Sequence, residues 1–236
     1  MYSYQRIPDA DFVIPHVEFN TVNEPLVDVT EFSSGKILFE PVYYNSGIPG
    51  AINKCYAREE VAKRLCAAAE KLPEGMSLKI FDAWRPFDVQ RALYERYRRK
   101  VASENKTLSA ERIDELTQRF VSIPKKDMLE SPVHSTGGAV DLTIVDARGQ
   151  ELDMGTEFDS FDQASNTVYF ENAGSGYEKV RDNRRFLYGL MTGLGFTNLP
   201  TEWWHFDFGD RFWAHYSNSA AIYTGIFQTG DVENEK

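Results

Sequence analysis

Two short stretches of the sequence carry residue types that can bind a metal ion, "HSTGGAVD" at 134–141 and "EWWH" at 202–205. The first places His134 seven residues before Asp141, and the second places Glu202 three residues before His205. Two imidazoles and one carboxylate would leave a fourth coordination position open. Catalytic zinc is bound in this way, whereas structural zinc prefers a closed, cysteine-rich shell. The two stretches together therefore favour a catalytic zinc site formed by His134, Asp141 and His205.

Glu202 and Arg85 could supply the rest of a hydrolytic reaction. A carboxylate beside the metal, walled by Trp203 and Trp204, could take a proton from water and later hand it to a leaving amine. Arg85 ends the stretch "LKIFDAWRP" and could stabilise the oxyanion that forms when water attacks a carbonyl. The alternative for Arg85 is a surface ion pair with Asp82 or Asp88.

The chain has four histidines, and a histidine that stands alone is usually structural. Neither His16 nor His215 belongs to these two stretches, so we expect both to be structural. Neither HExxH nor CxxC nor GxSxG occurs in the sequence. Classical zincins, zinc ribbons and nucleophile-elbow hydrolases therefore have no support.

Two strands must position these side chains. In a strand over 139–146, Asp141 lies on the face opposite to the apolar Val140 and Leu142, because side chains alternate. Gly137 and Gly138 allow a tight turn that folds His134 back beside Asp141. In a last strand over 203–210, His205 lies opposite to the tryptophan and phenylalanine face. Since positions three apart in a strand point to opposite faces, Glu202 must lie in the loop before it.

The remaining pattern predicts the other elements. Apolar residues at three- and four-residue steps indicate a helix over 57–73, and further helices are expected over 86–105, 109–121 and 183–196. Strands are expected over 76–84 and over 36–45, where Pro41 breaks the second, and 153–178 is expected to be irregular. No regular βαβ alternation occurs. The fold class is therefore predicted as α+β, with a small, largely antiparallel central sheet flanked by helices. We expect an arm at 1–30, one catalytic domain at 31–228 and a frayed tail at 229–236.

Composition narrows the class of protein and of partner. Hydrophobic residues make up 42% and charged residues 26% of 236 residues, which is typical of a globular chain. The net charge of −10 argues against nucleic acid and anionic membrane surfaces as partners. No apolar run reaches the length of a membrane span, and the N-terminus lacks a signal-peptide pattern. Cys55 and Cys66 indicate two thiols in a reducing compartment, so a cytoplasmic protein is expected.

The stretches "FDAWRP", "HSTGGAVDLTI" and "EWWH", in this order, resemble the D-alanyl-D-alanine dipeptidases of the VanX type. These belong to the zinc DD-peptidase family M15, whose fold is shared with the hedgehog signalling domain. Two further stretches, "NKCYAREEVAKRL" at 53–65 and "MGTEFDSFDQAS" at 154–165, are also similar to that family. The resemblance spans roughly 30–215.

The resemblance implies one zinc ion per chain, held by His134, Asp141 and His205. It implies Glu202 as general base and acid, and Arg85 as the residue that stabilises the transition state. The implied reaction is zinc-dependent hydrolysis of the dipeptide D-Ala-D-Ala to D-alanine.

The sequence departs from the family pattern at two positions. Pro132 stands where the family often has serine, which leaves the exact dipeptide preference open, and Trp84 stands where tyrosine is common. A dipeptide with two charged ends also needs residues to hold them, and Asp207 and Ser135 are candidates.

Other functions remain open. The same site could act on longer wall peptides as a peptidoglycan D,D-carboxypeptidase or endopeptidase, or it could be a non-catalytic zinc-binding module. The sequence does not separate a role in vancomycin resistance from D-alanine salvage, and it predicts no oligomeric state.

Overall fold

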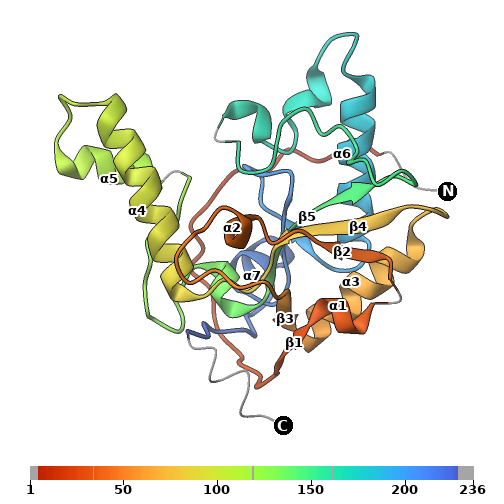
Figure 1. Ribbon diagram of the computed structural model, residues 1–236, viewed down its shortest axis with the longest axis horizontal. Helices are drawn as coiled ribbons and strands as arrows, with labels where there is room; N and C mark the ends of the chain where they lie inside the picture. The colour runs from red at the N-terminus through yellow and green to blue at the C-terminus, as the bar shows by residue number, and fades with distance from the viewer. Residues whose placement is uncertain (1–4, 34, 119, 161, 228–236) are drawn as a thin grey trace.

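A five-stranded mixed sheet forms the centre of the computed structural model, which describes residues 5–33, 35–118, 120–160 and 162–227 (Figure 1). The strand order is β2-β4-β5-β7-β6, and β2 runs parallel to β4 while the other three pairings are antiparallel. The strands are β2 (Ile37–Phe39), β4 (Ser77–Asp82), β5 (Ala139–Val145), β6 (Thr197–Asn198) and β7 (His205–Asp207). The prediction of an α+β fold is confirmed, and the largely antiparallel sheet is correct except for one parallel pair.

Two helices, α3 (Glu59–Lys71) and α6 (Glu178–Thr192), pack with the strands into one hydrophobic core. In α3 the buried positions recur at three- and four-residue steps, acidic residues fill the first turn, and Pro73 follows the end of the helix. From β5, Val140, Leu142 and Ile144 enter the same core. Burial of each such side chain stabilises the folded state by about 1.5–3 kcal/mol. The core thus fixes one face of β5 and leaves its other face for different residues.

A helical hairpin of α4 (Phe87–Glu104) and α5 (Ala110–Gln118) projects from the sheet (Figure 1). Pro86 immediately precedes α4, where its missing N–H costs no hydrogen bond. Both helices agree with the sequence prediction, although α5 ends three residues earlier. Only Ile113 and Thr117 are buried in α5, so this hairpin is weakly tied to the core.

Three sequence expectations need correction. The strand expected over 36–45 ends at Phe39, because Pro41 cannot donate a ladder hydrogen bond and starts the short helix α2 (Val42–Asn45) instead. Helix α6 begins five residues before the expected 183. The expected last strand at 203–210 is shorter, since β7 is followed by helix α7 (Arg211–Ser217), which Asp210 caps.

A second, two-stranded sheet was not predicted. In it β1 (Leu26–Asp28) pairs antiparallel with β3 (Tyr56–Arg58), and helix α1 (Val29–Phe32) follows β1. Further toward the N-terminus, the amides of Asn20 and Val22 donate to the C-terminal segment at 221–222. The division into an arm at 1–30 and one domain at 31–228 stays a prediction, and the predicted frayed tail at 229–236 lies outside the described residues.

The segment predicted to be irregular contains two short 3₁₀ helices, η2 (Gln163–Ser165) and η3 (Tyr169–Asn172). A third, η1 (Val133–Thr136), precedes β5. Among the helices in the described part of the chain, none is long and apolar enough to cross a membrane.

Candidate metal centre and active site

Asp141 and His205 are direct neighbours across the pairing of β5 and β7. Each strand sends its apolar side chains into the core, so these two polar side chains share the opposite face. Both are almost fully buried, with relative exposures of 2% for Asp141 and 3% for His205. The predicted strand faces and their adjacency are confirmed.

His134 reaches the same place from the 3₁₀ helix η1. Pro132 precedes this helix, and Gly137 ends it with a left-handed φ of 74°, which glycine adopts without strain. A Cβ at Gly138 would lie 2.5 Å from the carbonyl oxygen of Phe208, so the second glycine permits close approach to the chain that follows β7. The glycine pair therefore turns the chain as the sequence predicts.

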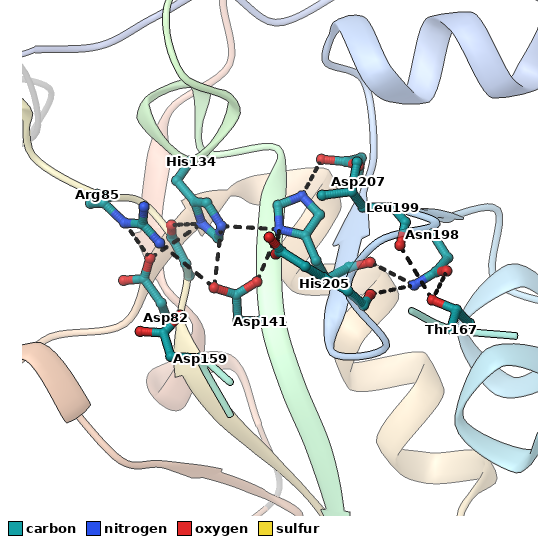
Figure 2. Close-up of polar contacts among 12 residues, drawn as sticks. Asp82, Arg85, His134, Asp141, Asp159, Thr167, Asn198, Leu199, His205 and Asp207 are labelled. Atoms are coloured by element: carbon teal, nitrogen blue, oxygen red, sulfur yellow. Dashed lines mark hydrogen bonds and ion pairs between the residues drawn. The ribbon is translucent and has the colours of Figure 1, made fainter. Parts of the chain in front are cut away.

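Side-chain atoms of three residues converge at the centre of this site (Figure 2). His134 Nε2 and His205 Nδ1 lie 3.2 Å apart, and Asp141 Oδ1 lies 3.0 Å from His205 Nδ1. Asp141 Oδ2 lies 3.3 Å from His134 Nε2. Ligands bonded to zinc at about 2.0–2.1 Å in tetrahedral geometry are themselves about 3.3–3.4 Å apart. Each histidine nitrogen is thus at a suitable distance from the other and from one oxygen of Asp141, and one ligand atom from each residue lies within 4.8 Å of the other two.

The hydrogen bonds behind the two imidazoles determine which nitrogens face the centre. His134 Nδ1 lies 2.8 Å from the carbonyl oxygen of Ala83, and His205 Nε2 lies 2.8 Å from Asp207 Oδ1. Both partners are acceptors, so these nitrogens carry the N–H of each neutral ring. The facing nitrogens are then lone-pair atoms, and a carboxylate points at both. Acceptors of three residues that meet in a buried place suit a cation between them, and ligating histidines are oriented in this manner.

The electrostatics of the site also favour positive charge. Burial alone would raise the pKa of Asp141, but His134 and His205 outweigh burial and hold the pKa well below its usual range. Burial alone would lower the pKa of His205, but the carboxylates of Asp207 and Asp141 raise it well above its usual range. Asp141 therefore stays ionised, and the carboxylates around His205 favour a positive charge at this position.

Glu202 lies in the turn before β7, as expected from the strand geometry. Its Oε2 is 3.9 Å from His205 Nδ1, so its carboxyl stands beside the three converging atoms without joining them. Trp203 and Trp204 are both buried, and the Trp203 indole donates to Thr156 Oγ1 at 2.8 Å. Burial raises the pKa of Glu202 to about 8. A carboxyl with such a pKa can both accept and donate a proton near neutral pH.

Arg85 pairs with Asp82, as the alternative from the sequence proposed, but not at the surface. Its Nε donates to Asp82 Oδ2 at 2.8 Å, its Nη1 donates to Gln90 Oε1 at 2.8 Å, and its side chain is only 11% exposed. Its Nη2 lies 3.7 Å from Asp141 Oδ2. Figure 2 shows the guanidinium beside His134 and Asp141. Two fixed hydrogen bonds thus aim the remaining N–H groups toward the centre.

A cavity of about 490 Å³ opens in front of these groups and is lined by Arg85, His134, Asp141, Glu202 and His205. All five residues predicted to form the site thus share one cavity. Their assignment as metal ligands, base and oxyanion donor stays a prediction.

Tyr43 and Asp159 also line the cavity and were not singled out from the sequence. Asp159 has a left-handed φ of 59°, and its Oδ2 accepts from the Tyr43 hydroxyl at 2.9 Å. Burial, reinforced by the charge of Asp141, raises the pKa of Asp159 to about 6. A non-glycine residue in this conformation is often held at a functional position. The only signal in the sequence was that the stretch 154–165 resembled the family.

Asp207 and Ser135, the two candidates for holding the ends of a substrate, do not line the cavity. Asp207 is 0% exposed and accepts from His205, on the side away from the cavity. Ser135 is 1% exposed, and its hydroxyl donates to the Arg85 carbonyl oxygen at 3.2 Å. Both side chains contact residues of the site from outside the cavity.

His16 and His215 lie outside the site, as expected. Neither lines the cavity, and His215 packs on the ring of Tyr216 in α7.

Comparison with known proteins adds an independent observation. Residues 47–222 match the peptidase M15 family, described as D-Ala-D-Ala dipeptidase. A D-alanyl-D-alanine dipeptidase of Synechocystis is 30% identical over 194 residues, covering 75% of this chain and 78% of the relative. The matched range contains all five residues of the site.

Two further relatives bear the same name. The D-alanyl-D-alanine dipeptidase of Escherichia coli is 32% identical over 133 residues, covering 56% of this chain and 55% of the relative. That of Enterococcus faecium is 29% identical over 163 residues, covering 68% of this chain and 76% of the relative. The resemblance inferred from the sequence motifs is confirmed.

Proposed function

Since this chain belongs to the peptidase M15 family of D-Ala-D-Ala dipeptidases, we propose that it hydrolyses D-Ala-D-Ala to D-alanine with a single zinc ion. One observation carries the proposal. Acceptor atoms of three buried residues, His134, Asp141 and His205, lie 3.0–3.3 Å from one another, with the carboxyl of Glu202 beside them. This arrangement supports Glu202 as the hydrolytic base of a metallopeptidase.

His134 Nε2, His205 Nδ1 and one Asp141 oxygen would hold the zinc. Zinc is the best fit to this donor set, because two imidazoles and one carboxylate leave one coordination position open. When bound, zinc would act as a Lewis acid that polarises the peptide carbonyl and lowers the pKa of water.

The residues around this position would carry out the proton transfers. Glu202 takes a proton from the attacking water, and water oxygen bonds to the carbonyl carbon. Arg85, held by Asp82 and Gln90, donates to the carbonyl oxygen as negative charge develops there. The C–N bond then breaks, and Glu202 returns its proton to the leaving amine.

Asp159 would hold the ammonium of the dipeptide. Its carboxylate lines the cavity, and the Tyr43 hydroxyl fixes its orientation. With a pKa of about 6, Asp159 carries a negative charge at neutral pH. An ammonium in the cavity would therefore find a preoriented partner.

We place this activity in the cytoplasm. Cys55 and Cys66 are both free thiols, which agrees with a reducing compartment. Cys55 is buried, and burial raises the pKa of its thiol well above the usual range, so it is unreactive.

The test is hydrolysis of a panel of dipeptides by the zinc-loaded chain. We expect turnover of D-Ala-D-Ala, loss of turnover after chelation, and recovery when zinc is returned. L-Ala-L-Ala should be cleaved far more slowly, and a wall pentapeptide ending in D-Ala-D-Ala tests the carboxypeptidase alternative. A chain that binds zinc and cleaves none of these would be a binding module, and the proposal would be rejected.

A further inference from the structure

The cavity continues beyond the catalytic groups along one face of α4. It is lined there by residues three apart, with one neighbour added, which share one stripe of the helix: Gln90, Leu93, Arg96, Tyr97 and Lys100. The stripe begins in the core and ends at the surface, since Gln90 is 1% exposed whereas Arg96 and Lys100 are exposed. One side of the cavity is therefore formed by a row of α4 side chains that runs from the catalytic centre to solvent.

The inner end of this stripe touches the catalytic machinery. Gln90 Oε1 accepts from Arg85 at 2.8 Å, and its amide donates to the Ser122 carbonyl oxygen at 2.7 Å. With a rise of 1.5 Å per residue, Arg96 lies about 9 Å and Lys100 about 15 Å along the helix from Gln90. Side chains on a helix lean toward its N-terminus, so both cations lean back toward the centre.

The charged side chains that line the cavity also differ between its inner and outer halves. Among the described residues that line it, every charged side chain lies at the catalytic centre except Arg96 and Lys100, which are both cations. Neither forms an ion pair with another described residue, although the Lys100 ammonium lies 5.9 Å from the centroid of the Tyr97 ring. The outer half of the cavity is therefore positively charged in a chain whose net charge is −10.

D-Ala-D-Ala does not need this outer half. Two methyl side chains fill little space, whereas cavities of about 300–1,000 Å³ enclose far larger ligands. This cavity has a volume of about 490 Å³. The size and the charge of the outer half remain unexplained by the dipeptide alone.

We propose that Arg96 and Lys100 form a subsite for a carboxylate that the substrate carries beyond the alanine methyl groups. This inference rests on the proposed function, because it concerns the substrate of the same site. An extended chain advances about 3.3–3.6 Å per residue, so the distance from Gln90 to Arg96 corresponds to about two to three residues. The carboxylate can belong to an acidic side chain of the second residue or to the C-terminus of a tripeptide.

Two matched substrate pairs distinguish these sources. The first pair is D-Ala-D-Glu and D-Ala-D-Gln, which differ only in the side-chain charge. The second pair is D-Ala-D-Ala-D-Ala and its C-terminal amide, cleaved at the first peptide bond. We expect the zinc-loaded chain to prefer the carboxylate in at least one pair by about fivefold or more in kcat/KM, since two ion pairs contribute.

The variant Arg96→Gln with Lys100→Gln should bring that preference close to one. The matched control is Arg91→Gln with Arg99→Gln, which removes the same charge from the same helix at exposed positions outside the cavity. The control should keep the preference, so an effect of net charge alone is separated from a local subsite.

Two results would overturn the inference, namely no preference for the carboxylate in either pair, or a preference that the double variant retains. Either result leaves hydrolysis of D-Ala-D-Ala, and hence the proposed function, intact. If D-Ala-D-Ala is not cleaved, the proposed function fails on its own. The Kd values of the same pairs, measured by calorimetry in a Glu202→Gln background, then decide the subsite.

Discussion

The cavity has an inner wall, formed by the residues around His134, Asp141 and His205, and an outer wall, formed by Arg96 and Lys100 of α4. The two walls differ in how tightly their polar groups are held. On the inner wall, Asp141 and His205 are at most 3% exposed, and the ring N–H of each histidine has a hydrogen-bond acceptor. On the outer wall, Arg96 and Lys100 are exposed and have no ion pair among the described residues. The inner wall is thus preorganised, whereas the outer wall can adapt.

This difference follows from how each wall is built. The inner wall stands on adjacent strands whose opposite faces lie in the core, so its side chains cannot move without disturbing that core. The outer wall stands on a hairpin in which α5 buries only Ile113 and Thr117. Charges act more strongly where water is excluded. We infer that the inner wall fixes the chemistry and that the outer wall affects which substrates are taken.

The largest effect on turnover is expected on the inner wall, at Glu202. Glu202→Gln keeps the size of the side chain but removes the base, so kcat should fall by about 10²–10⁴. The metal content should be unchanged, because Glu202 is not among the converging atoms. Rates and zinc content of the same preparation check this. Turnover equal to that of the unchanged chain would rule out Glu202 as the base.

A somewhat smaller loss is expected at Arg85. Arg85→Gln removes the donor to the developing oxyanion, and kcat should fall by about 10²–10³ while zinc is retained. The control is Arg91→Gln, an exposed arginine of α4 that pairs with Asp88 outside the cavity. Steady-state kinetics on D-Ala-D-Ala would show equal rates for the two variants if Arg85 were merely structural.

A substitution of Asp207 tests whether the hydrogen bond that orients His205 matters for zinc binding. Its Oδ1 accepts from His205 Nε2 at 2.8 Å and so orients the ring. Asp207→Asn should weaken zinc binding by about 10–100-fold, since loss of a group behind a metal ligand typically has this effect. Competition with a chelator of known affinity gives the ratio. An unchanged affinity would mean that the orientation of His205 does not depend on Asp207.

The smallest effect on the reaction is expected from the outer hairpin. Ile113→Ala removes a buried contact of α5. Such truncations lower the free energy of unfolding of the part that contains them by about 2–5 kcal/mol. Hydrogen exchange should accelerate in α4 and α5 but not in β5, because the hairpin is a separate unit of stability. Equal acceleration in β5 would show that the two walls unfold together and would remove the basis of the comparison.

The sequence predicted the inner wall better than the rest of the molecule. Strand periodicity placed Asp141 and His205 on one face, and that local rule holds because their neighbours must enter the core. The position of Glu202 in a turn followed from the same rule. Residue types and spacing suggested the specific roles, and the resemblance to a family made those roles sharper.

Asp159, Tyr43 and Gln90 could not be predicted, since their meeting depends on contacts between distant segments. Asp159 is 116 residues from its partner Tyr43, in a region without periodicity. The pairing of β1 with β3 was missed for the same reason, because three-residue strands leave no pattern to detect.

The central claim is that His134, Asp141 and His205 together hold one divalent ion on which hydrolysis depends. Its most direct test is the zinc content per folded chain, measured alongside turnover of D-Ala-D-Ala for the unchanged protein and for His205→Ala. The account predicts one zinc per chain with turnover in the first and neither in the second, with unchanged circular dichroism. Equal zinc content in both proteins, or turnover without metal, would contradict it.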